Sequence, residues 1–331
     1  MRRRLIRSLL ISMMMLLLPG TMGSAGAAEP VRLMLQWTHQ AQFTGYYVAK
    51  EKGLYSSLGL DVTIIQGGPK IDQLAELEQG NADFATAWLS TGLTRRSQGL
   101  PLVHVAQIVN ESNLVMVSWK NSDLPSAKTL RGQVVSIWEG DFRAPYLDWF
   151  QSEEIDVAAI VPQYYSVNLF LRKGVTACSA MYYNELHMVY QAGVEADEIF
   201  VYFLKDYGFG FPEDGIYCLE QTMASRPEAV ASFRQASLQG WQYAADHPEE
   251  ALDIVMKYVT AANVPTNRPH MKWMMEKILA SSLPGVGDRW KLGELRLGDY
   301  DRTVKALVEQ GTLSAPMPIN VFTGKVNSRV P

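Results

Sequence analysis

The sequence predicts an α/β fold of two lobes, and three features of the chain support that prediction. Short apolar segments alternate with segments whose apolar residues recur at helical spacing, a pattern typical of parallel sheets flanked by helices. The alternation runs through residues 31–120 and starts again at residue 133. After residue 221 the chain turns mostly helical. Two strand–helix blocks followed by a helical return indicate two α/β lobes, each with its own apolar core.

The predicted strands are short apolar runs rich in β-branched and aromatic residues. The first block contains runs at residues 31–37, 61–66, 82–88, 101–109 and 113–120. The second block contains runs at residues 133–138, 159–165, 175–183, 198–204 and 215–221. We expect the runs 113–120 and 215–221 to cross between the lobes. Two strands at a hinge let the lobes close on a ligand while each lobe stays rigid.

The predicted helices follow these strands, and glycines such as Gly53 and Gly80 mark their ends. They lie at residues 44–59, 71–80, 90–99, 143–154, 166–174, 184–193, 226–259, 269–283 and 293–313. We therefore assign residues 28–118 and 221–315 to a discontinuous first lobe and residues 119–220 to the second lobe. Residues 316–331 are expected to form a C-terminal tail.

Residues 1–27 have the composition of an export signal. Arginines at positions 2, 3, 4 and 7 precede an apolar run at residues 8–18 that is too short to span a bilayer. Residues 25–27 read Ala-Gly-Ala, a small-residue cleavage site. We expect cleavage after Ala27, with Ala28 as the alternative, and export to the periplasm. No cysteine follows the apolar run, so we do not expect a lipoprotein. The competing interpretation is a buried N-terminal helix.

The charge of the chain argues against nucleic acid and anionic membrane as partners. The formal net charge of the whole chain is −4, and removal of the four arginines of the signal moves it to −8. An acidic protein without basic runs repels phosphate-rich surfaces. We expect a small-molecule ligand instead.

The chain shows no strong metal or redox motif. Its two cysteines, Cys178 and Cys218, do not form a C-x-x-C pair, and the sequence leaves open whether they form a disulfide. The five histidines do not form an H-x-x-x-H or H-E-x-x-H set, and there is no G-x-S-x-G elbow. We therefore expect no cofactor and no metal. His39 is expected in a loop near the mouth of the cleft, and His187 at the surface or in packing.

Four predicted strands end in aromatic residues mixed with amides, hydroxyls or carboxylates. Ligands bind beyond the carboxyl ends of strands in open α/β sheets, so these residues are the candidate binding site. They are Trp37, Gln40, Gln42, Phe43, Trp88, Thr91, Trp138, Asp141, Phe142, Tyr182, Tyr183, Asn184 and Glu185. Flat rings stack on a planar molecule, and amides and carboxylates pair with the polar groups at its edge. The site therefore favours a small planar, polar ligand.

Several of these residues also have a purely structural interpretation. Trp37 and Trp88 are both compatible with a place in the lobe core. Ser90, Thr91 and Asn184 are compatible with helix caps, and a carboxylate at Glu185 is also favoured by the helix dipole. Successive residues of a strand alternate faces, so at most one of Tyr182 and Tyr183 is expected to face the cleft.

Gly140 and Arg143 form a second, weaker candidate site for an anion. Gly140 opens a predicted helix, where backbone N–H groups can hold a phosphate or carboxylate, and Arg143 adds positive charge. A glycine turn beside a solvated arginine explains the same residues equally well.

The run LQWTHQAQFTGYYVAKEKGLYSSLGLDVTI, residues 35–64, resembles a known family signature. The resemblance is to periplasmic binding proteins for thiamine pyrimidine precursors, which are related to the fungal thiamine-pyrimidine synthase and to sulfonate-binding proteins. The segments ELEQGNADF, LRGQVVSIWEGDF and SAMYYNE extend the resemblance over nearly all of the chain after the signal. It implies a type II periplasmic-binding-protein fold, a cleft between lobes, and delivery of ligand to an ABC importer. It also implies an aromatic platform at Trp37 and a carboxylate that reads the ligand at Glu185.

The chain departs from both branches of that family. The binding proteins commonly open with W-x-P-N-x-x-H-x-G, whereas this chain has His39, Gln40 and Phe43 at the polar positions. This change admits a different heterocycle, such as a flavin precursor. The synthase uses a donor histidine that aligns with Thr91, a lysine that aligns near Ala87, and a cysteine cluster near residues 208–215, which contain no cysteine.

From these features we expect a monomeric periplasmic solute-binding protein that captures an aminopyrimidine thiamine precursor and delivers it to an ABC permease. The alternatives are binding of a flavin precursor or a sulfonate, and a sensory protein that docks on a membrane kinase. A third is an exported enzyme related to the synthase, with Asp141, Glu185 and His39 as its reactive groups. The sequence does not discriminate a permease from a sensor as the membrane partner.

Overall fold

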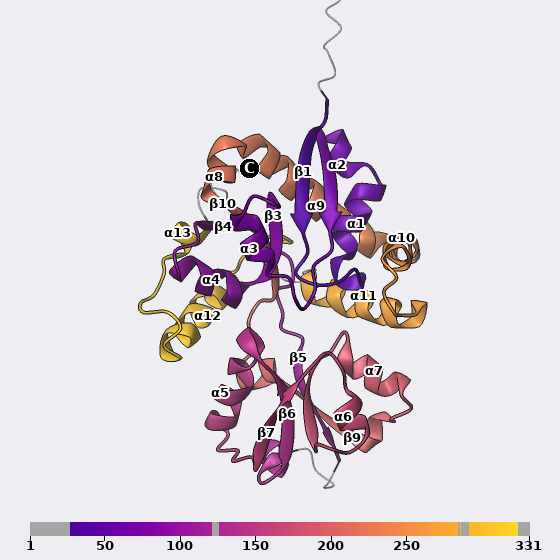
Figure 1. The fold of residues 1–331 in the computed structure, drawn as a ribbon, viewed down its shortest axis with the longest axis vertical. Coiled ribbons are helices and arrows are strands. Elements are labelled where there is room, and N and C mark those ends of the chain that lie inside the picture. The colour runs from indigo at the N-terminus through magenta and orange to yellow at the C-terminus, as the bar shows by residue number, and fades with distance from the viewer. Residues whose placement is uncertain (1–26, 121–125, 284, 286–290, 324–331) are drawn as a thin grey trace, which may run out of the picture.

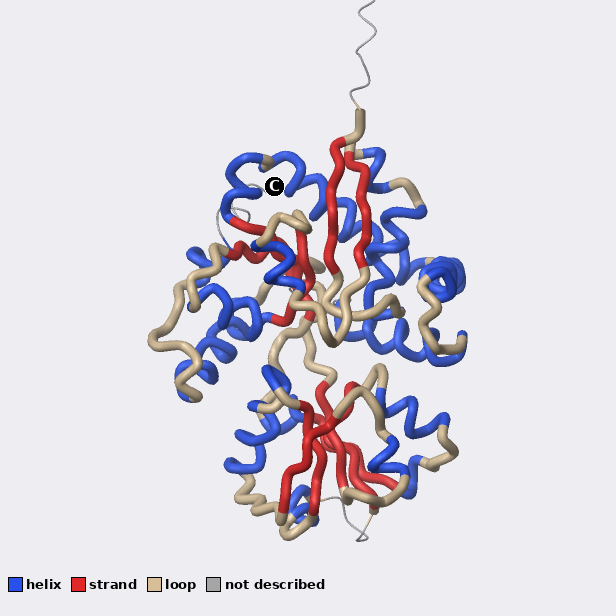
Figure 2. The backbone as a smooth tube through the Cα atoms, viewed as in Figure 1, coloured by secondary structure: helices blue, strands red, loops and turns tan. Residues whose placement is uncertain are grey.

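The computed structural model describes residues 27–120, 126–283, 285 and 291–323 of the chain. The predicted signal peptide and residues 324–331 of the predicted tail lie outside the described residues, apart from Ala27. Within the described residues the strands and helices gather into a larger and a smaller lobe, one above the other in Figure 1. Two stretches of chain connect the lobes (Figure 2).

The larger lobe is built on a five-stranded sheet in the order β2-β1-β3-β10-β4. Its strands are β1 (Glu29–Met34), β2 (Leu60–Ile65), β3 (Phe84–Trp88), β4 (Leu102–Gln107) and β10 (Asp214–Leu219). Strand β1 pairs in parallel with β2 and β3, whereas β10 runs antiparallel to β3 and β4. Every residue of β3 and β4 is buried, as expected for strands with helices on both faces.

The smaller lobe contains a second five-stranded sheet in the order β7-β6-β8-β5-β9. Its strands are β5 (Leu114–Trp119), β6 (Val134–Trp138), β7 (Ala159–Gln163), β8 (Ala177–Met181) and β9 (Ile199–Phe203). Strand β6 is parallel to β7 and β8, and β5 is antiparallel to β8 and β9. The two mixed sheets have the same arrangement, so the prediction of two α/β lobes is confirmed.

Strand pairing moves both predicted lobe boundaries. Residues 114–118 were assigned to the first lobe, but β5 pairs with β8 and β9 of the second sheet. Residues 214–220 were assigned to the second lobe, but β10 pairs with β3 and β4 of the first sheet. The crossovers are therefore the segments 108–113 and 204–213. Strands β5 and β10, which were predicted to cross between the lobes, begin directly after these segments. Sequence pattern shows where a strand lies but not which sheet it joins, because the partners are distant in the chain.

Helices cover both faces of each sheet. The α-helices of the first half of the chain are α1 (Thr44–Glu51), α2 (Leu54–Ser57), α3 (Gln73–Glu78), α4 (Leu89–Ser97), α5 (Ala144–Ser152), α6 (Asn168–Leu171) and α7 (Glu185–Gln191). Those of the second half are α8 (Glu220–Ser225), α9 (Pro227–Asp246), α10 (Pro248–Ala261), α11 (Arg268–Ser282), α12 (Leu297–Glu309) and α13 (Ile319–Thr323). Short 3-10 helices are η1 (Ala41–Phe43), η2 (Ala127–Leu130), η3 (Gly140–Phe142), η4 (Ala196–Glu198) and η5 (Leu204–Tyr207).

The apolar core is continuous between the lobes, which corrects the expectation of two separate cores. One buried cluster contains residues of the first sheet, such as Leu33, and of the second sheet, such as Ile137. It passes through Ile108, Val109 and Leu114 beside the first crossover. The core is continuous because Ile108 and Val109, the first two residues of the crossover, and Leu114 directly after it are apolar and buried.

The predicted C-terminal tail is wrong for residues 316–323. Helix α13 packs on β4, and the Phe322 side chain is fully buried. Its ring lies 5.8 Å from His104 and 5.9 Å from Tyr300, and Tyr300 Oη donates to the Met317 carbonyl at 2.9 Å. The buried Phe322 ring therefore holds this segment against the first lobe. The segment is too short to show the apolar periodicity of a long amphipathic helix, so the sequence pattern did not indicate it.

Candidate functional site

Aromatic side chains from both lobes meet in the cleft between the two sheets. The Trp37 ring, which follows β1, lies 5.0 Å from the Tyr165 ring, which follows β7. The Trp88 ring at the end of β3 lies 4.6 Å from the Phe142 ring of η3, edge to face at 78°. Each pair joins one residue of the larger lobe to one of the smaller lobe. All four residues lie just beyond or at the carboxyl ends of parallel strands, where ligands bind in open α/β sheets.

Three further aromatic candidates lie on the smaller lobe. Trp138, the last residue of β6, is nearly buried, and its ring lies 6.1 Å from Phe142. Asp141 belongs to the same short helix as Phe142. Tyr182 and Tyr183 were predicted inside a strand, but β8 ends at Met181 and both lie in the turn before α7. Their side chains nevertheless have different surroundings. Tyr183 is buried, with 3% of its surface exposed, whereas the Tyr182 ring packs against the rings of Phe203 and Trp273.

A buried carboxylate, Asp214, forms the floor of the cleft on the larger lobe. Gln36 Nε2 donates to Asp214 Oδ1, and Gln42 Nε2 donates to Asp214 Oδ2 at 2.7 Å. Gln40 Nε2 in turn donates to Gln42 Oε1 at 2.6 Å. Burial raises the pKa of Asp214 to about 6, and the hydrogen bonds from Gln42, Gln36 and Trp88 oppose that rise. The glutamines expected to read the ligand are therefore engaged in holding this carboxylate.

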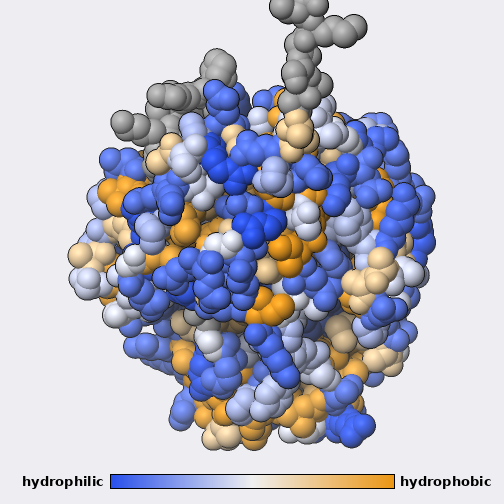
Figure 3. Space-filling view, turned by 45° about the horizontal axis from the view of Figure 1, so that its top comes forward, coloured by the Kyte–Doolittle hydropathy of each residue, from blue (hydrophilic) through white to orange (hydrophobic). Residues whose placement is uncertain are grey.

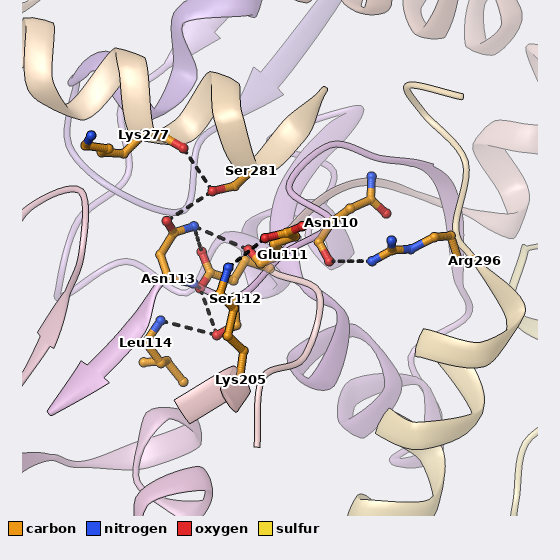
Figure 4. Close-up of polar contacts among 10 residues, drawn as sticks. Asn110, Glu111, Ser112, Asn113, Leu114, Lys205, Lys277, Ser281 and Arg296 are labelled. Carbon is orange, nitrogen blue, oxygen red and sulfur yellow. Dashed lines mark hydrogen bonds and ion pairs between the residues drawn. The ribbon is translucent and has the colours of Figure 1, made fainter. Parts of the chain in front are cut away.

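The neighbouring residue, Glu213, connects the two crossovers through Ser112 and Asn113, which are labelled in Figure 4. Its carboxylate accepts hydrogen bonds from the backbone N–H of Asn113 at 2.5 Å, from Asn113 Nδ2 at 3.2 Å and from Ser112 Oγ at 3.3 Å. Ser281 Oγ of α11 donates to Asn113 Oδ1 at 3.1 Å. Burial is the largest cause of a rise in the pKa of Glu213 to about 8, and Asp214 adds to it. The hinge thus contains a carboxylate that is costly to ionise.

Glu213 should make the stability of the protein depend on pH. Its folded-state pKa of about 8 exceeds its ordinary value of 4.5, so the folded protein keeps a proton that the unfolded chain loses. The stabilisation is present in full below pH 4.5 and is lost as the pH rises towards 8. We expect the unfolding free energy of the wild type, minus that of Glu213→Gln, to fall across this interval in denaturant titrations. A difference that stays constant with pH would contradict the assignment.

Glu185 supplies a third buried carboxylate, from the smaller lobe. Its Oε2 accepts from the backbone N–H of Met181 at 2.9 Å, and its Oε1 accepts from Asn184 Nδ2 at 2.8 Å. Burial raises the pKa of Glu185, and these hydrogen bonds oppose the rise. The pKa of Tyr183 is raised first by burial and then by the charges of Glu213, Asp214 and Glu185. All three carboxylates are buried, and their charges act together on the Tyr183 hydroxyl.

Four candidates lie elsewhere or are engaged by other groups. Phe43 is fully buried in the core of the larger lobe, so it has no surface to offer a ligand. Thr91 lies in the first turn of α4. Arg143 forms an ion pair with Glu139 at 2.6 Å, and the helix that Gly140 opens has three residues. The anion site at these last two residues remains a prediction without support from the geometry.

His39 and Asn184 have roles that the sequence did not indicate. His39 lies in the loop between β1 and η1, as expected, but it is buried at 9% exposed, and its Nδ1 lies 2.9 Å from Tyr47 Oη. Asn184 precedes α7, but its side chain does not cap the helix. Its Nδ2 donates to Glu185, and its Oδ1 lies 2.9 Å from His270 Nε2 of α11.

Sequence reasoning missed Tyr165, Glu213 and Asp214 as cleft residues. Glu213 and Asp214 lie at the start of strand β10, whereas binding residues were expected at the carboxyl ends of strands. Because β10 is antiparallel to β3, its first residue lies at the same sheet edge as the carboxyl ends of the parallel strands. An acidic pair directly before an apolar run was the available signal. Tyr165 is the last residue of the predicted strand 159–165 and was not among the candidates, and in the structure it lies beyond β7, which ends at Gln163.

The helices and the potential metal ligands of the described part of the chain bear on two classes of function, membrane spanning and metal binding. None of its helices combines the length and apolar character needed to cross a bilayer. Among the described residues no three His, Cys, Asp or Glu side chains gather as metal ligands. Cys178 and Cys218 are free and buried in different sheets. On the face seen in Figure 3, apolar residues lie in small groups among hydrophilic ones.

Two α/β lobes with matching mixed sheets, joined by two crossover segments, define a type II periplasmic-binding-protein fold. Known structures agree: the periplasmic aliphatic sulphonate binding protein SsuA from Escherichia coli superposes with a TM-score of 0.68 at 12% identity, covering 90% of this chain and 98% of that one. The profile of the NMT1/THI5 like family matches residues 40–251. The chain belongs to this family.

Relatives of known name include both binding proteins and an enzyme. The riboflavin-binding protein RibY of Chloroflexus aurantiacus is 25% identical over 310 residues, covering 90% of this chain and 86% of its own. A formylaminopyrimidine-binding protein of Halalkalibacterium halodurans is 26% identical over 250 residues, covering 72% and 73%. A 4-amino-5-hydroxymethyl-2-methylpyrimidine phosphate synthase of Legionella pneumophila is 21% identical over 315 residues, covering 88% and 92%.

Proposed function

We propose that this protein is the periplasmic solute-binding protein of an ABC importer and that its ligand is a planar nitrogen heterocycle. The observation that carries the proposal is the pairing of rings across the cleft around three buried carboxylates. The rings supply flat apolar faces, and the carboxylates of Asp214 and Glu185 can accept hydrogen bonds from N–H groups at the edge of a heterocycle. Neither feature suits a sulfonate, whose oxygens are negatively charged and accept hydrogen bonds.

The cleft must open for the ligand to enter. Trp37 and Tyr165 lie 5.0 Å apart, whereas two rings that sandwich a third need about 7 Å, twice the normal contact distance between carbon atoms. Tyr165 is 57% exposed and is the freer partner of the pair. Tyr165 therefore lies against the Trp37 ring, and we expect a stacked ligand to displace it.

An aminopyrimidine precursor of thiamine is the first candidate ligand. Its exocyclic amine matches the carboxylates of Glu185 and Asp214, and a relative that binds a formylaminopyrimidine supports it. Riboflavin is the second candidate, because its extended ring suits the two ring pairs, and the relative that binds it is matched over 90% of this chain. The changes at His39, Gln40 and Phe43 from the usual opening motif are compatible with either.

Direct binding measurements discriminate the candidates. We expect formylaminopyrimidine or riboflavin to raise the melting temperature of the purified protein and to give saturable heat in calorimetry, because a ligand that binds only the folded state stabilises it. Riboflavin fluorescence should be quenched if its ring stacks on Trp37. Taurine and other alkanesulfonates serve as the negative panel. Binding of a sulfonate with no response to either heterocycle would refute the proposed ligand class.

The enzyme alternative is tested by recovery of the ligand. The positions that align with the synthase's reactive groups hold Ala87 and Thr91, and residues 208–215 contain no cysteine. We expect the bound heterocycle to be released chemically unchanged after prolonged incubation, as seen by mass spectrometry. A permease as the membrane partner is favoured over a sensor kinase because the named binding-protein relatives and the fold neighbour are solute-binding proteins.

A further inference from the structure

A chain of hydrogen bonds runs from the interface of the lobes to the site carboxylate Glu185. His187 on α7 of the smaller lobe and His270 on α11 of the larger lobe approach with Nδ1 atoms 2.8 Å apart. His270 Nε2 lies 2.9 Å from Asn184 Oδ1, and Asn184 Nδ2 donates to Glu185 Oε1 at 2.8 Å. In Figure 1, α11 lies at the base of the upper lobe and α7 at the top of the lower lobe.

These contacts fix the proton on each histidine. Asn184 Nδ2 faces a carboxylate, so Asn184 Oδ1 faces His270 and can only accept a hydrogen bond. His270 Nε2 therefore carries a proton, and in the neutral ring its Nδ1 is the acceptor. The hydrogen between the two Nδ1 atoms then belongs to His187. A second proton on His187 would go to its Nε2 and would leave the hydrogen bond between the two Nδ1 atoms intact. A second proton on His270 would go to its Nδ1 and would break that hydrogen bond.

We propose that His270 is a positioning residue that holds the lobes closed and orients Glu185 through Asn184, and that protonation of His270 Nδ1 opens this side of the cleft. The interface around it reinforces the closed form. Trp273 stacks on His187 with centroids 4.8 Å apart, and its Nε1 donates to the Tyr182 carbonyl at 3.0 Å.

The charged groups nearby do not provide a partner for a protonated His270. On the helices packed here, Arg268 pairs with Asp253 and Glu249 of α10, and Lys272 pairs with the same Glu249. Lys277 lies 4.3 Å above the Trp273 ring and adds positive charge. Glu185 of α7 is separated from His270 by the Asn184 amide. Protonation therefore places a charge beside a second imidazole without a direct carboxylate contact.

The direction of the pH effect follows from burial. Burial, with His187 as the second cause, lowers the pKa of His270 to about 4 in the closed form. In the open form the ring is exposed to water, and its pKa returns towards the ordinary value of about 6.5. The closed form binds fewer protons, so closure is favoured above pH 6.5 and weakens as the pH falls towards 4. At pH 5 the closed-to-open ratio should be about 30-fold lower than at pH 8.

Distances between the lobes test the proposal without a ligand. Spin labels on Lys257→Cys of α10 and Asp197→Cys of η4, both exposed positions on different lobes, report lobe separation, and the native cysteines are buried. We expect the wild-type background to shift to longer distances between pH 7.5 and 5, and His270→Gln, which cannot titrate, to give the same distance distribution at both pH values. His187→Asn, which retains a donor, should keep the pH response. His247→Gln, at a histidine stacked on Tyr243 far from the interface, is the matched control.

A second readout tests the titration itself. Ring NMR signals of His270, assigned from His270→Gln, should titrate below the ordinary value of about 6.5 in the wild type and over the same pH range as the change in lobe distance. A pKa of His270 near 6.5, an unchanged distance in the wild type at pH 5, or an equal pH response in His270→Gln would each overturn the proposal. The proposal concerns the proposed binding site but these readouts do not depend on the ligand, so a failure of ligand binding and a failure of this mechanism remain distinguishable.

Discussion

Trp37→Ala should weaken binding of the heterocycle by about 30- to 150-fold, a loss of about 2–3 kcal/mol. The Trp37 ring is the platform at the end of β1, and its removal deletes the largest flat surface that the larger lobe presents to the ligand. The variant should fold normally, because Trp37 is only partly buried at the edge of the core. Calorimetry with the heterocycle that binds the wild type provides the measurement.

Trp119→Ala is the matched control for that experiment. Trp119 ends β5 at the edge of the sheet away from the crossover, where it stacks on Phe170 at 4.6 Å. Its loss removes a similar ring without touching the cleft, so affinity should stay within about twofold. An unchanged affinity in Trp37→Ala would remove the platform from the site, and equal losses in both variants would indicate a general effect of destabilisation.

Gly240→Ala should lower the unfolding free energy by about 2 kcal/mol or more, although alanine is the better helix former. Gly240 lies in α9 where that helix crosses α1. A Cβ atom there would lie 2.1 Å from the Gly45 backbone oxygen and 2.7 Å from Ala49 Cβ. Backbone cannot rotate away as a side chain can, so α1 must shift and its buried contacts with α9 must loosen. Denaturant titration monitored by circular dichroism gives the value.

Gly298→Ala provides the comparison within the same protein. Gly298 lies in α12, and the nearest atom to an added Cβ is Arg302 Nη1 at 3.9 Å, an ordinary contact. Here only helix propensity changes, so stability should be unchanged or rise by up to about 1 kcal/mol. If both glycine variants behaved alike, the close approach of α1 and α9 would not limit stability.

Local pattern in the sequence determined most of the fold. The ten predicted strands and the main helices are present in the structure. Apolar runs indicate strands, and apolar residues at helical spacing indicate helices, because both patterns reflect interactions between residues that are close together in the chain. Trp37 and Glu185 were also selected as candidate site residues from their place at strand ends, and their roles in ligand binding stay predictions. Sequence pattern did not indicate that Gln42 donates to Asp214, which is 172 residues away in the chain, or that Gln40 donates to Gln42.

The sequence by itself thus determined an α/β chain of two strand–helix blocks with aromatic and polar residues at the strand ends. Only the tertiary structure decided which sheet β5 and β10 join, that the core continues between the lobes, and that Asp214 and Glu213 lie at the cleft. It also decided that His270 meets His187 and Asn184. The physical reason is the same in each case: these features depend on pairing between residues that are distant in the chain, and such pairing leaves no periodic signal in the sequence around either partner.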